Sequence, residues 1–407
     1  MRILYISQYF PPEMGAPSAR VYELSKRWVQ QGQQVIVLTG FPHHPTGNIP
    51  SQYKQHIFKR ETTDGIKVIR TYIFPAANKG FLKRIASYMS FMLSSIFLGT
   101  WNVDKPDLII ATSPQLFVAI AGYIISKIKH RPFILEIRDF WPESIIQLGQ
   151  LKNKIILNIL KMIELFLYHH AKVIVVVADS SVSILNHKGI PSSKIIVIKN
   201  GVDLELFDAR KQNTDLKNKL ELNNKFVVSY IGTLGLSHAL DQVIHSASIL
   251  RNQSDIHFLF IGEGAEKNNL LTLAKENGLS NITFLDQIDK QNLPYYYSLS
   301  DVVLVTLRKL ELFSCVIPSK IFEIMAMAKP ILLSVDGEAR KLVIDEANAG
   351  IFVEPENSLE MAQKIVELYS NHKLRQKLGE NGLKFVQKNY NRIHLADKYL
   401  NYLLQMI

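Results

Sequence analysis

The chain has 407 residues, 47% of them hydrophobic and 20% charged, a composition that is typical of globular proteins and excludes a disordered or fibrous chain. This length predicts two or three domains. The net charge is +11, and a single cysteine, Cys315, excludes an intrachain disulfide and fits a reducing compartment.

The charge is unevenly distributed. Residues 1–200 hold 24 Lys and Arg against 11 Asp and Glu, whereas residues 201–407 hold 23 against 25. A basic first half indicates a polyanionic partner, such as nucleic acid, anionic lipid or a phosphorylated substrate. The alternative is that the charge serves solubility alone.

The first residues, MRILYISQYFPPEMG, do not predict a signal peptide, because the apolar run is broken by Gln8 and ends at Pro11-Pro12. Short Val/Ile-rich runs without polar alternation then predict strands that are buried on both faces of a parallel sheet. In the first half these runs are Arg2–Ser7, Gln34–Thr39, Ile66–Phe74, Asp107–Ala111, Phe133–Ile137, Val173–Val177 and Lys194–Ile198.

Two helical segments of the first half are unusually apolar. Ile85–Trp101 has 17 residues without a charge and follows Lys83 and Arg84. Its length is at the lower limit for a membrane span, and its serines favour a helix that lies in the membrane interface. Packing in the core of the first domain is the alternative, and Ile155–His170 poses the same choice.

The pattern restarts after residue 200. The predicted strands there are Phe226–Gly232, Ile256–Gly264, Ile282–Leu285, Asp301–Leu307, Pro330–Ser334 and Gly350–Pro355. We therefore predict an α/β protein of two doubly wound, Rossmann-like domains that join near residue 200, with a terminal helix from Asn389 onward.

Polar residues follow two strands of the first half. Gly15 precedes a helix N-terminus, where doubly wound sheets bind anionic ligands, although the G-x-G-x-x-G fingerprint is absent. Arg138, Asp139 and Glu143 follow Phe133–Ile137 and predict a polar substrate site. A tight turn at Gly15 and a local Arg–carboxylate pair are the structural alternatives.

The second half holds two glycine loops that could approach a phosphate. Gly232 and Gly235 follow one predicted strand, and Gly262 and Gly264 follow the next. Either loop alone is weak evidence, but both lie in one domain.

The stretch VIPSKIFEIMAMAKPIL predicts a third part of that site. The N–H groups of Ser319 and Lys320 and the Lys320 ammonium would hold a phosphate at a helix start, and Glu323 would accept hydrogen bonds from a ribose. The alternative is ordinary capping. It fits poorly, because the position three residues after Ser319 is Phe322, not Glu or Gln.

These stretches together are similar to one family. The chain resembles the retaining glycosyltransferases of family 4 in ILYISQYFPPEMGAPSARVYELSKRWVQQGQQVIVLT, in NGVD at Asn200–Asp203, in YIGTLG, in GEG and in PSKIFEIMAMAKPIL. RDFWPES with PSK looks like the branch that builds O-antigens, capsules and colanic acid, including L-fucosamine transferases.

The resemblance implies the GT-B fold, in which two Rossmann-like domains face a cleft and a C-terminal helix crosses back. Residues 1–200 would form the basic, membrane-facing acceptor domain, and 201–388 would form the nucleotide-sugar domain. Residues 389–407 would pack on the first domain. The chain would be cytoplasmic and peripheral on the inner face of the cell membrane.

The implied donor is a nucleotide sugar, with UDP and an N-acetylated deoxyamino sugar such as N-acetyl-L-fucosamine as our expectation. The implied acceptor is a polyprenyl-diphosphate-linked saccharide. The expected donor-binding residues are Gly232, Thr233, Leu234, Gly262, Gly264, Ser319, Lys320 and Glu323. The expected acceptor-binding residues are Gly15, Arg138, Glu143 and His44.

This sequence departs from the family pattern at two places. Cys315 stands where the family usually has its first glutamate, and Thr233 and His238 stand where many members have Arg and Lys. We therefore expect Lys320 to carry more of the phosphate binding. We expect transfer with retention, without a metal or other cofactor, in which Lys320 and the N–H groups of 232–234 stabilise the leaving phosphate and Asp139 positions or deprotonates the acceptor.

Two other functions remain open at this point. A UDP-N-acetylhexosamine 2-epimerase would share the two-domain architecture without needing a membrane acceptor. A nucleic-acid binder would need clustered cations with stacking aromatics, whereas the charges of this chain are spread thinly.

Overall fold

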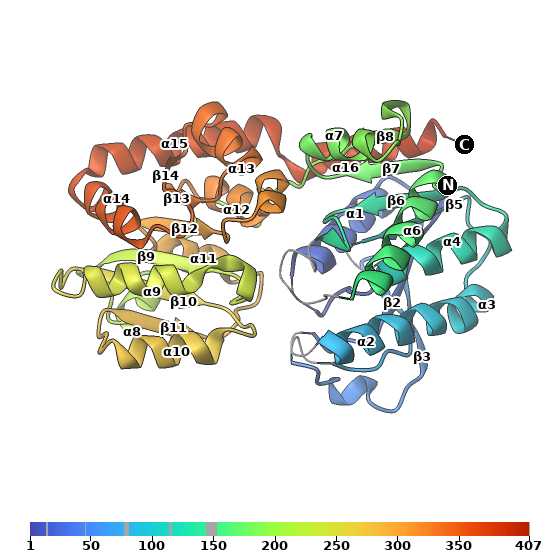
Figure 1. The fold of residues 1–407 in the computed structure, drawn as a ribbon, viewed down its shortest axis with the longest axis horizontal. Coiled ribbons are helices and arrows are strands. Elements are labelled where there is room, and N and C mark those ends of the chain that lie inside the picture. Colours follow the sequence, from blue (N-terminus) through green and yellow to red (C-terminus); the bar gives the residue numbers. More distant parts are fainter. Residues whose placement is uncertain (14, 45, 77–80, 114–115, 144–152, 407) are drawn as a thin grey trace. The chain divides into compact units, whose positions relative to one another are not determined.

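The computed structural model describes the chain except for residues 14, 45, 77–80, 114–115, 144–152 and 407. The described chain divides into two compact units (Figure 1). Unit 1 comprises Met1–Asn200 and Ile393–Ile407, and unit 2 comprises Gly201–Arg392.

Unit 1 is built on an eight-stranded sheet in the order β3-β4-β2-β1-β5-β6-β7-β8. All neighbouring strands are parallel except β3 and β4, which form an antiparallel hairpin. The strands are β1 Arg2–Ile6, β2 Gln34–Gly40, β3 Phe58–Thr63, β4 Ile66–Thr71, β5 Leu108–Thr112, β6 Phe133–Ile137, β7 Val173–Val176 and β8 Ile195–Val197.

The sequence prediction locates seven of these eight strands and misses β3. FKRETT in β3 is only half-buried and carries charges, so it lacks the apolar run of the other strands. The hairpin turn is nevertheless visible in the sequence as Asp64-Gly65. Both residues have positive φ, as a two-residue hairpin turn requires.

Helices cover both faces of this sheet. They are α1 Ala16–Gln30, α2 Phe81–Ser94, α3 Thr100–Asn102, α4 Leu116–Lys129, α6 Lys154–His170, α7 Ser180–His187 and α16 Arg392–Leu404. A π-helical turn, Ser95–Gly99, joins α2 to α3, so Phe81–Asn102 forms one helical run. No helix in the part of the chain that the structure describes is both long and apolar enough to cross a membrane.

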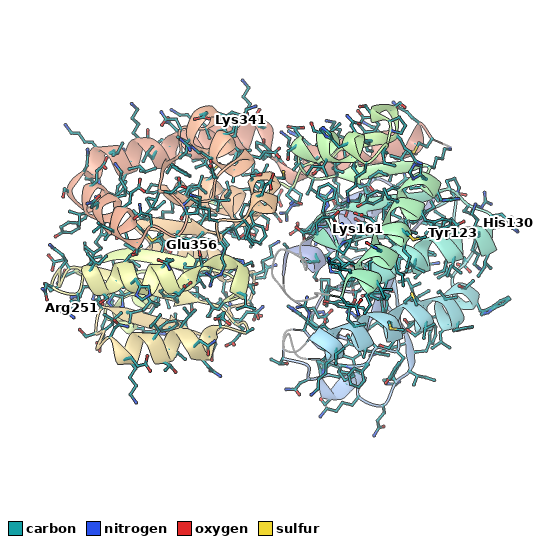
Figure 2. The ribbon with its side chains drawn as sticks, in the orientation of Figure 1. Tyr123, His130, Lys161, Arg251, Lys341 and Glu356 are labelled. Carbon is teal, nitrogen blue, oxygen red and sulfur yellow. The ribbon has the colours of Figure 1, made fainter. Side chains whose placement is uncertain are left out.

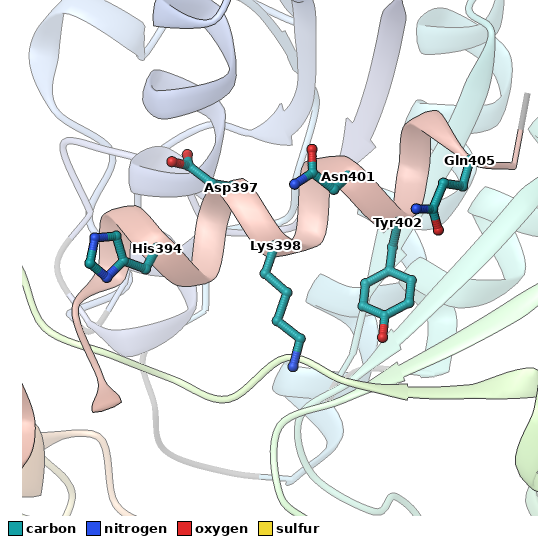
Figure 3. Close-up of a pocket in the computed structure, with 6 residues that line it drawn as sticks. All are labelled: His394, Asp397, Lys398, Asn401, Tyr402 and Gln405. Atoms are coloured by element: carbon teal, nitrogen blue, oxygen red, sulfur yellow. The ribbon is translucent and has the colours of Figure 1, made fainter. Parts of the chain in front are cut away.

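The last helix, α16, completes the core of unit 1. The Trp28 indole N–H donates to the carbonyl oxygen of Ala396 at 3.0 Å, and the Trp28 and Tyr399 rings lie edge to face, 5.3 Å apart. Arg27 pairs with Asp397 at 2.7 Å. An open pocket also lies along α16 (Figure 3), but its lining residues come from that helix and from Gln405 just after it, and none is a predicted site residue.

Unit 2 is built on a six-stranded, wholly parallel sheet in the order β11-β10-β9-β12-β13-β14. All six strands lie where the Val/Ile runs predict them. The strands are β9 Phe226–Ile231, β10 Ile256–Ile261, β11 Ile282–Leu285, β12 Val302–Thr306, β13 Ile331–Ser334 and β14 Gly350–Phe352. Their side chains pack into two apolar clusters, one on each face of the sheet.

The helices of unit 2 follow the strands in alternation. They are α8 Thr214–Lys219, α9 Leu240–Ile249, α10 Lys267–Glu276, α11 Leu293–Leu299, α12 Lys320–Ala326, α13 Glu338–Arg340 with the π-helical turn Lys341–Glu346, α14 Ser358–Ser370 and α15 His372–Asn389. In a parallel sheet all strand carboxyl ends share one edge. The loops after β9, β10 and β12 therefore gather there.

Candidate functional site

Lys320 is the centre of the candidate site in unit 2. Its ammonium nitrogen is buried and has no hydrogen-bond partner among the residues that the structure describes. It lies 3.8 Å from the centre of the Tyr230 ring and next to Gly232, where an added β-carbon would be 2.7 Å from it. Burial lowers the pKa of Lys320 to about 7, although Glu323 opposes the shift.

A buried, unpartnered cation is unfavourable unless an anion binds it. The ring of Tyr230 compensates only in part, because a cation–π contact is weaker than a charge-assisted hydrogen bond. The site is therefore poised to gain free energy when an anionic group arrives beside Gly232.

The loops after β9 and β10 are joined through their backbones. The N–H of Gly232 donates to Ile261, and the N–H of Leu234 donates to Glu263, both at 2.9 Å. A β-carbon at Gly262 would lie 1.9 Å from the carbonyl oxygen of Gly232, and one at Gly264 would lie 2.2 Å from that of Leu234. These two glycines are thus required by loop-to-loop contact.

This pairing corrects one expectation. The sequence predicts that the N–H groups of Gly232 and Leu234 stabilise a phosphate, but both already donate to carbonyl oxygens at the end of β10 and in the loop after it. On that loop the N–H of Thr233 remains without a partner within the described chain, and the Thr233 side chain is exposed. It is the donor that the loop can offer to a ligand.

Helix α12 begins at Lys320, with Ser319 at its N-cap. Ser319 makes no side-chain capping bond, so the capping alternative is not realised. No partner is found for the N–H of Ser319 or Lys320 in the described part of the chain. Because α12 has only seven residues, its dipole is small, and the Lys320 charge is the stronger attraction for an anion.

Glu323 lies one turn after Ser319 and accepts a hydrogen bond from the Tyr297 hydroxyl at 3.2 Å. Burial raises its pKa, while Lys290, Tyr297 and Lys320 oppose the shift.

His238 cannot replace the cation that many family members have at that position. Burial and, secondly, Lys320 lower its pKa to about 3, so the imidazole is neutral near pH 7. Its Nδ1 lies 3.3 Å from the Gly235 carbonyl oxygen. Lys320, whose ammonium nitrogen is buried, supplies a cation at this end of the sheet.

In unit 1 the predicted residues also lie at strand carboxyl ends, after β1, β2 and β6. Gly15 has φ +130 and directly precedes α1. His44 donates its backbone N–H to Glu13 at 2.9 Å, and its ring lies 5.2 Å from that of Tyr9. Burial, with His43 and Arg84, lowers the pKa of His44 to about 4, so its ring is neutral near pH 7.

The residues after β6 separate into two groups. The Arg138 guanidinium has two buried nitrogens, Nε and Nη1, without partners among the described residues, and Asp139 is exposed. The local Arg–carboxylate pair is therefore not formed. The surrounding protein raises the pKa of Asp139 and Arg138 opposes the shift, but solvent contact keeps the effect on charge at neutral pH small.

Glu143 does not join them, which corrects the expected three-residue cluster. Lys188 binds Glu143 at 2.6 Å and Glu164 at 2.8 Å. Glu143 is thereby tied to a structural ion-pair cluster between α6 and α7. Ser144 of the same stretch and Met14 of the loop after β1 lie outside the described residues.

Three functional-looking residues of unit 1 were missed. Gln8, after β1, is 1% exposed and neither amide atom has a partner in the described chain. Glu13 accepts the N–H groups of His43 and His44, and burial raises its pKa to about 7. Glu136 lies inside β6, and a carboxylate in the apolar run FILEI was the signal that could have revealed it.

Among the described residues no group of three or more His, Cys, Asp or Glu side chains could hold a metal ion. The unit 2 site thus offers a buried ammonium, free N–H groups and a carboxylate, all near the carboxyl ends of the strands. The unit 1 site offers an unpartnered guanidinium, a buried amide and exposed Asp139. The first combination suits a phosphorylated ribose, and the second suits hydroxyl-bearing ligands.

Two family models match the two halves of the chain. Residues 18–206 match the family model Glycosyltransferase Family 4, and residues 212–385 match Glycosyl transferases group 1. An Escherichia coli K12 protein named for a glycosyl transferase of colanic acid biosynthesis, WcaI, is 27% identical over 366 residues, covering 88% of this chain and 89% of that protein.

Solved structures share the fold at lower identity. Sucrose-phosphate synthase from Thermosynechococcus elongatus superposes with a TM-score of 0.78 at 18% identity, covering 100% of this chain and 98% of that one. Anabaena Alr3699/HepE in complex with UDP and glucose superposes with a TM-score of 0.72 at 18% identity and 98% coverage of both chains. The predicted fold class is confirmed.

Proposed function

Because this chain is a glycosyltransferase with the GT-B fold, we propose that it transfers a sugar, with retention, from a UDP-linked donor to a lipid-linked saccharide in surface polysaccharide synthesis. The similarity to the colanic acid protein supports the pathway class, and the UDP complex of HepE supports the nucleotide. N-acetyl-L-fucosamine is the donor sugar we would test first.

The observation that carries this proposal is the unpartnered Lys320 ammonium beside Gly232. In the proposed reaction the bond between the anomeric carbon and the diphosphate oxygen breaks, and negative charge grows on the departing diphosphate. Lys320 and the N–H of Thr233 stabilise that charge, and Glu323 holds the ribose. A buried cation that is already desolvated acts strongly at this moment.

In unit 1 we propose that Arg138, Gln8 and Asp139 bind the acceptor. Asp139 orients or deprotonates the attacking hydroxyl, and Arg138 offers its free N–H groups to an acceptor oxygen. The new glycosidic bond forms on the face from which the diphosphate leaves. Gly15 and neutral His44 shape the loops around this end of the sheet.

The first test is nucleotide binding by calorimetry with UDP, GDP and ADP, followed by transfer assays with UDP-sugars and an undecaprenyl-diphosphate-linked saccharide. Lys320→Ala should weaken UDP binding or turnover about tenfold or more, since a charge-assisted contact to phosphate is lost. Unchanged UDP binding together with unchanged turnover in Lys320→Ala would refute the assigned role.

Lys329→Ala is the matched control. Lys329 lies just beyond the other end of α12, and burial lowers its pKa too, but its ammonium donates to the Ser298 carbonyl oxygen at 3.0 Å. Its removal should reduce stability without changing UDP affinity. A 2-epimerase would instead convert a UDP-N-acetylhexosamine with no acceptor present, which the same assays detect.

A further inference from the structure

One side of the helical run Phe81–Asn102 exposes a line of large apolar side chains. Tyr88, Phe91 and Ser95 face the interior. The opposite side exposes Leu82, Met89, Leu93, Phe97 and Trp101, at intervals of seven, four, four and four residues. Trp101 is 82% exposed. One side of this helical run thus packs in the core, as one sequence alternative predicts, while the other side is exposed, as in an amphipathic helix.

Helix α6 exposes even more apolar surface. Its inner side buries Glu164, Leu167 and Tyr168. Its outer side exposes six large apolar residues, namely Ile155, Ile156, Ile159, Met162, Leu165 and Phe166. A surface helix of a protein without a partner normally carries polar residues on that side.

Helix α4 links the two apolar lines. The Tyr88 ring on α2 lies 6.4 Å from Phe117 on α4, and the Tyr123 ring on α4 lies 5.1 Å from Phe166 on α6. Figure 1 shows α2, α4 and α6 on unit 1, and Figure 2 labels Tyr123 on α4, His130 just after α4 and Lys161 on α6. With Ile128, these helices carry 12 of the 23 exposed large apolar residues of the described chain. We call these 12 residues the three-helix surface.

The exposed charges on these helices are of one sign, and Asp104, which follows α3, is paired with Lys67 at 3.9 Å. The described residues of α2–α3 and α4 include no Asp or Glu, and the one carboxylate of α6, Glu164, is buried against Lys188. The cations there are Lys83, Arg84, Lys127, Lys129, Lys154 and Lys161. Apolar residues on helices whose exposed charges are cations suit an anionic bilayer better than a protein partner, whose polar rim carries both signs.

A basic pocket adjoins the three-helix surface. It is lined by Lys127, His130, Arg131, His170 and Lys172, together with Ser126, Pro132 and Phe133, and contains no carboxylate. The His170 ring lies 4.0 Å from that of Phe166, so the pocket opens where the apolar surface ends. Cations at helix C-termini are ordinary, but the buried Arg131 Nε has no partner among the described residues, which a helix dipole does not explain.

We propose that unit 1 lies flat on an anionic phospholipid bilayer through the three-helix surface, with a lipid phosphate held in the basic pocket. The apolar side chains enter the acyl boundary, and the cations meet the headgroups. This deepens the proposed function by giving a lipid-linked acceptor its membrane. Docking itself does not depend on which sugar is transferred.

The native tryptophans provide the first readout. Trp28 and Trp141 are buried, whereas Trp101 is exposed. Emission should therefore shift to shorter wavelength when vesicles of phosphatidylcholine with phosphatidylglycerol are added to the full chain. Trp101→Phe should abolish the shift while sedimentation with vesicles persists. Absence of both shift and sedimentation at millimolar lipid would overturn the proposal.

Substitutions then test the apolar residues and the basic pocket one after the other. Ile155→Gln with Met162→Gln removes exposed apolar contact without adding charge, and should weaken vesicle binding about tenfold or more. Leu359→Gln, at a 57% exposed site on α14 of unit 2, is the matched control and should change nothing. Equal losses in both variants would contradict the proposal.

Lys127→Gln with Arg131→Gln should weaken binding to anionic vesicles about thirtyfold and leave binding to pure phosphatidylcholine unchanged. Lys127→Gln alone serves if the double variant melts at lower temperature. Inorganic phosphate is then titrated into the protein without vesicles. Binding of phosphate that Lys127→Gln weakens as much as it weakens vesicle binding would reveal a free phosphate site and overturn the assignment to a headgroup, whereas no phosphate binding is expected. Gel filtration tests the alternative of a protein interface. If the native chain is a dimer and the Ile155→Gln, Met162→Gln variant is a monomer, the surface is a protein interface and the proposal is overturned.

The same variants distinguish a failure of membrane docking from a failure of the proposed transferase function. They should retain UDP binding and transfer to a water-soluble acceptor, losing only transfer to acceptor in vesicles. If UDP does not bind the native protein at all, the proposed function fails while the vesicle result stands on its own.

Discussion

The carbonyl oxygen of Gly232 occupies the place that a β-carbon of residue 262 would need, at a separation of 1.9 Å. Residue 262 also has φ +151, a conformation that favours glycine. The loops after β9 and β10 can therefore meet only through a backbone without a side chain, and their contact places Gly232 beside Lys320.

Gly262→Ala should push these loops apart. We expect a loss of about 1–3 kcal/mol of stability and a clear loss of UDP affinity, measured by thermal unfolding and calorimetry. Gly278→Ala is the control, since Gly278 also has positive φ but has no atom within 4 Å of an added β-carbon. Equal effects of the two substitutions on UDP affinity would show that loop contact is irrelevant to the site.

Lys320 should make nucleotide binding dependent on pH. With a pKa of about 7 it is about half neutral in the free protein at pH 7. A bound diphosphate favours the ammonium form, so binding takes up a proton and affinity falls as pH rises from 7 to 9. Calorimetry in buffers of different ionisation enthalpy measures this uptake.

Lys320→Arg is the informative comparison, because a guanidinium stays charged throughout that range. It should bind UDP with little pH dependence above pH 7. Proton uptake that persists unchanged in this variant would assign the titration to another group.

Glu323 should recognise the ribose. Glu323→Ala should reduce UDP affinity about tenfold, because two hydroxyl hydrogen bonds to a carboxylate are lost. The sharper readout is the ratio of UDP to 2′-deoxy-UDP affinity, which should exceed one in the native protein and approach one in the variant. A ratio that the substitution leaves intact would exclude this contact.

The ion pair of Arg20 and Glu136 should dominate the acid stability of unit 1. Arg20 donates to Glu136 at 3.1 Å, and Tyr5 and Thr112 donate to the same carboxylate at 2.9 and 3.0 Å. Burial opposes ionisation of Glu136, yet Arg20 and these hydrogen bonds outweigh it and lower the pKa. This stabilisation is present above the unfolded pKa near 4.5 and is lost as pH falls through the folded value.

Glu136→Gln should therefore cost about 3–5 kcal/mol at pH 7 and less in acid, measured by denaturant unfolding. Asp397→Asn breaks the half-exposed pair with Arg27 and should cost about 0–1 kcal/mol. If Glu136→Gln costs as little as Asp397→Asn, the buried pair does not stabilise this unit.

Much of the fold follows from local pattern. A strand covered by helices on both faces must be apolar throughout, so Val302–Thr306 and its neighbours are recognisable without knowing their partners. β3 escapes that rule because it lies at an edge of the sheet and exposes one face.

The site is less predictable because its contacts are distant in sequence. Glu143 looks free until Lys188, 45 residues later, is seen to bind it. The N–H groups of Gly232 and Leu234 look available until the loop after β10 is paired with them. Lys320 was identified from its neighbours in sequence, but only the fold shows that its ammonium is buried and without a partner.

The helix α16 has a consequence for synthesis on the ribosome. Ala396, Tyr399, Leu400 and Leu403 belong to the core that Trp28 helps to form, yet they are translated after all of unit 2. Unit 2 is continuous in sequence and is complete first. The first half of the nascent chain therefore has an incomplete core until α16 has been synthesised. During that time the apolar residues of the three-helix surface are exposed as well.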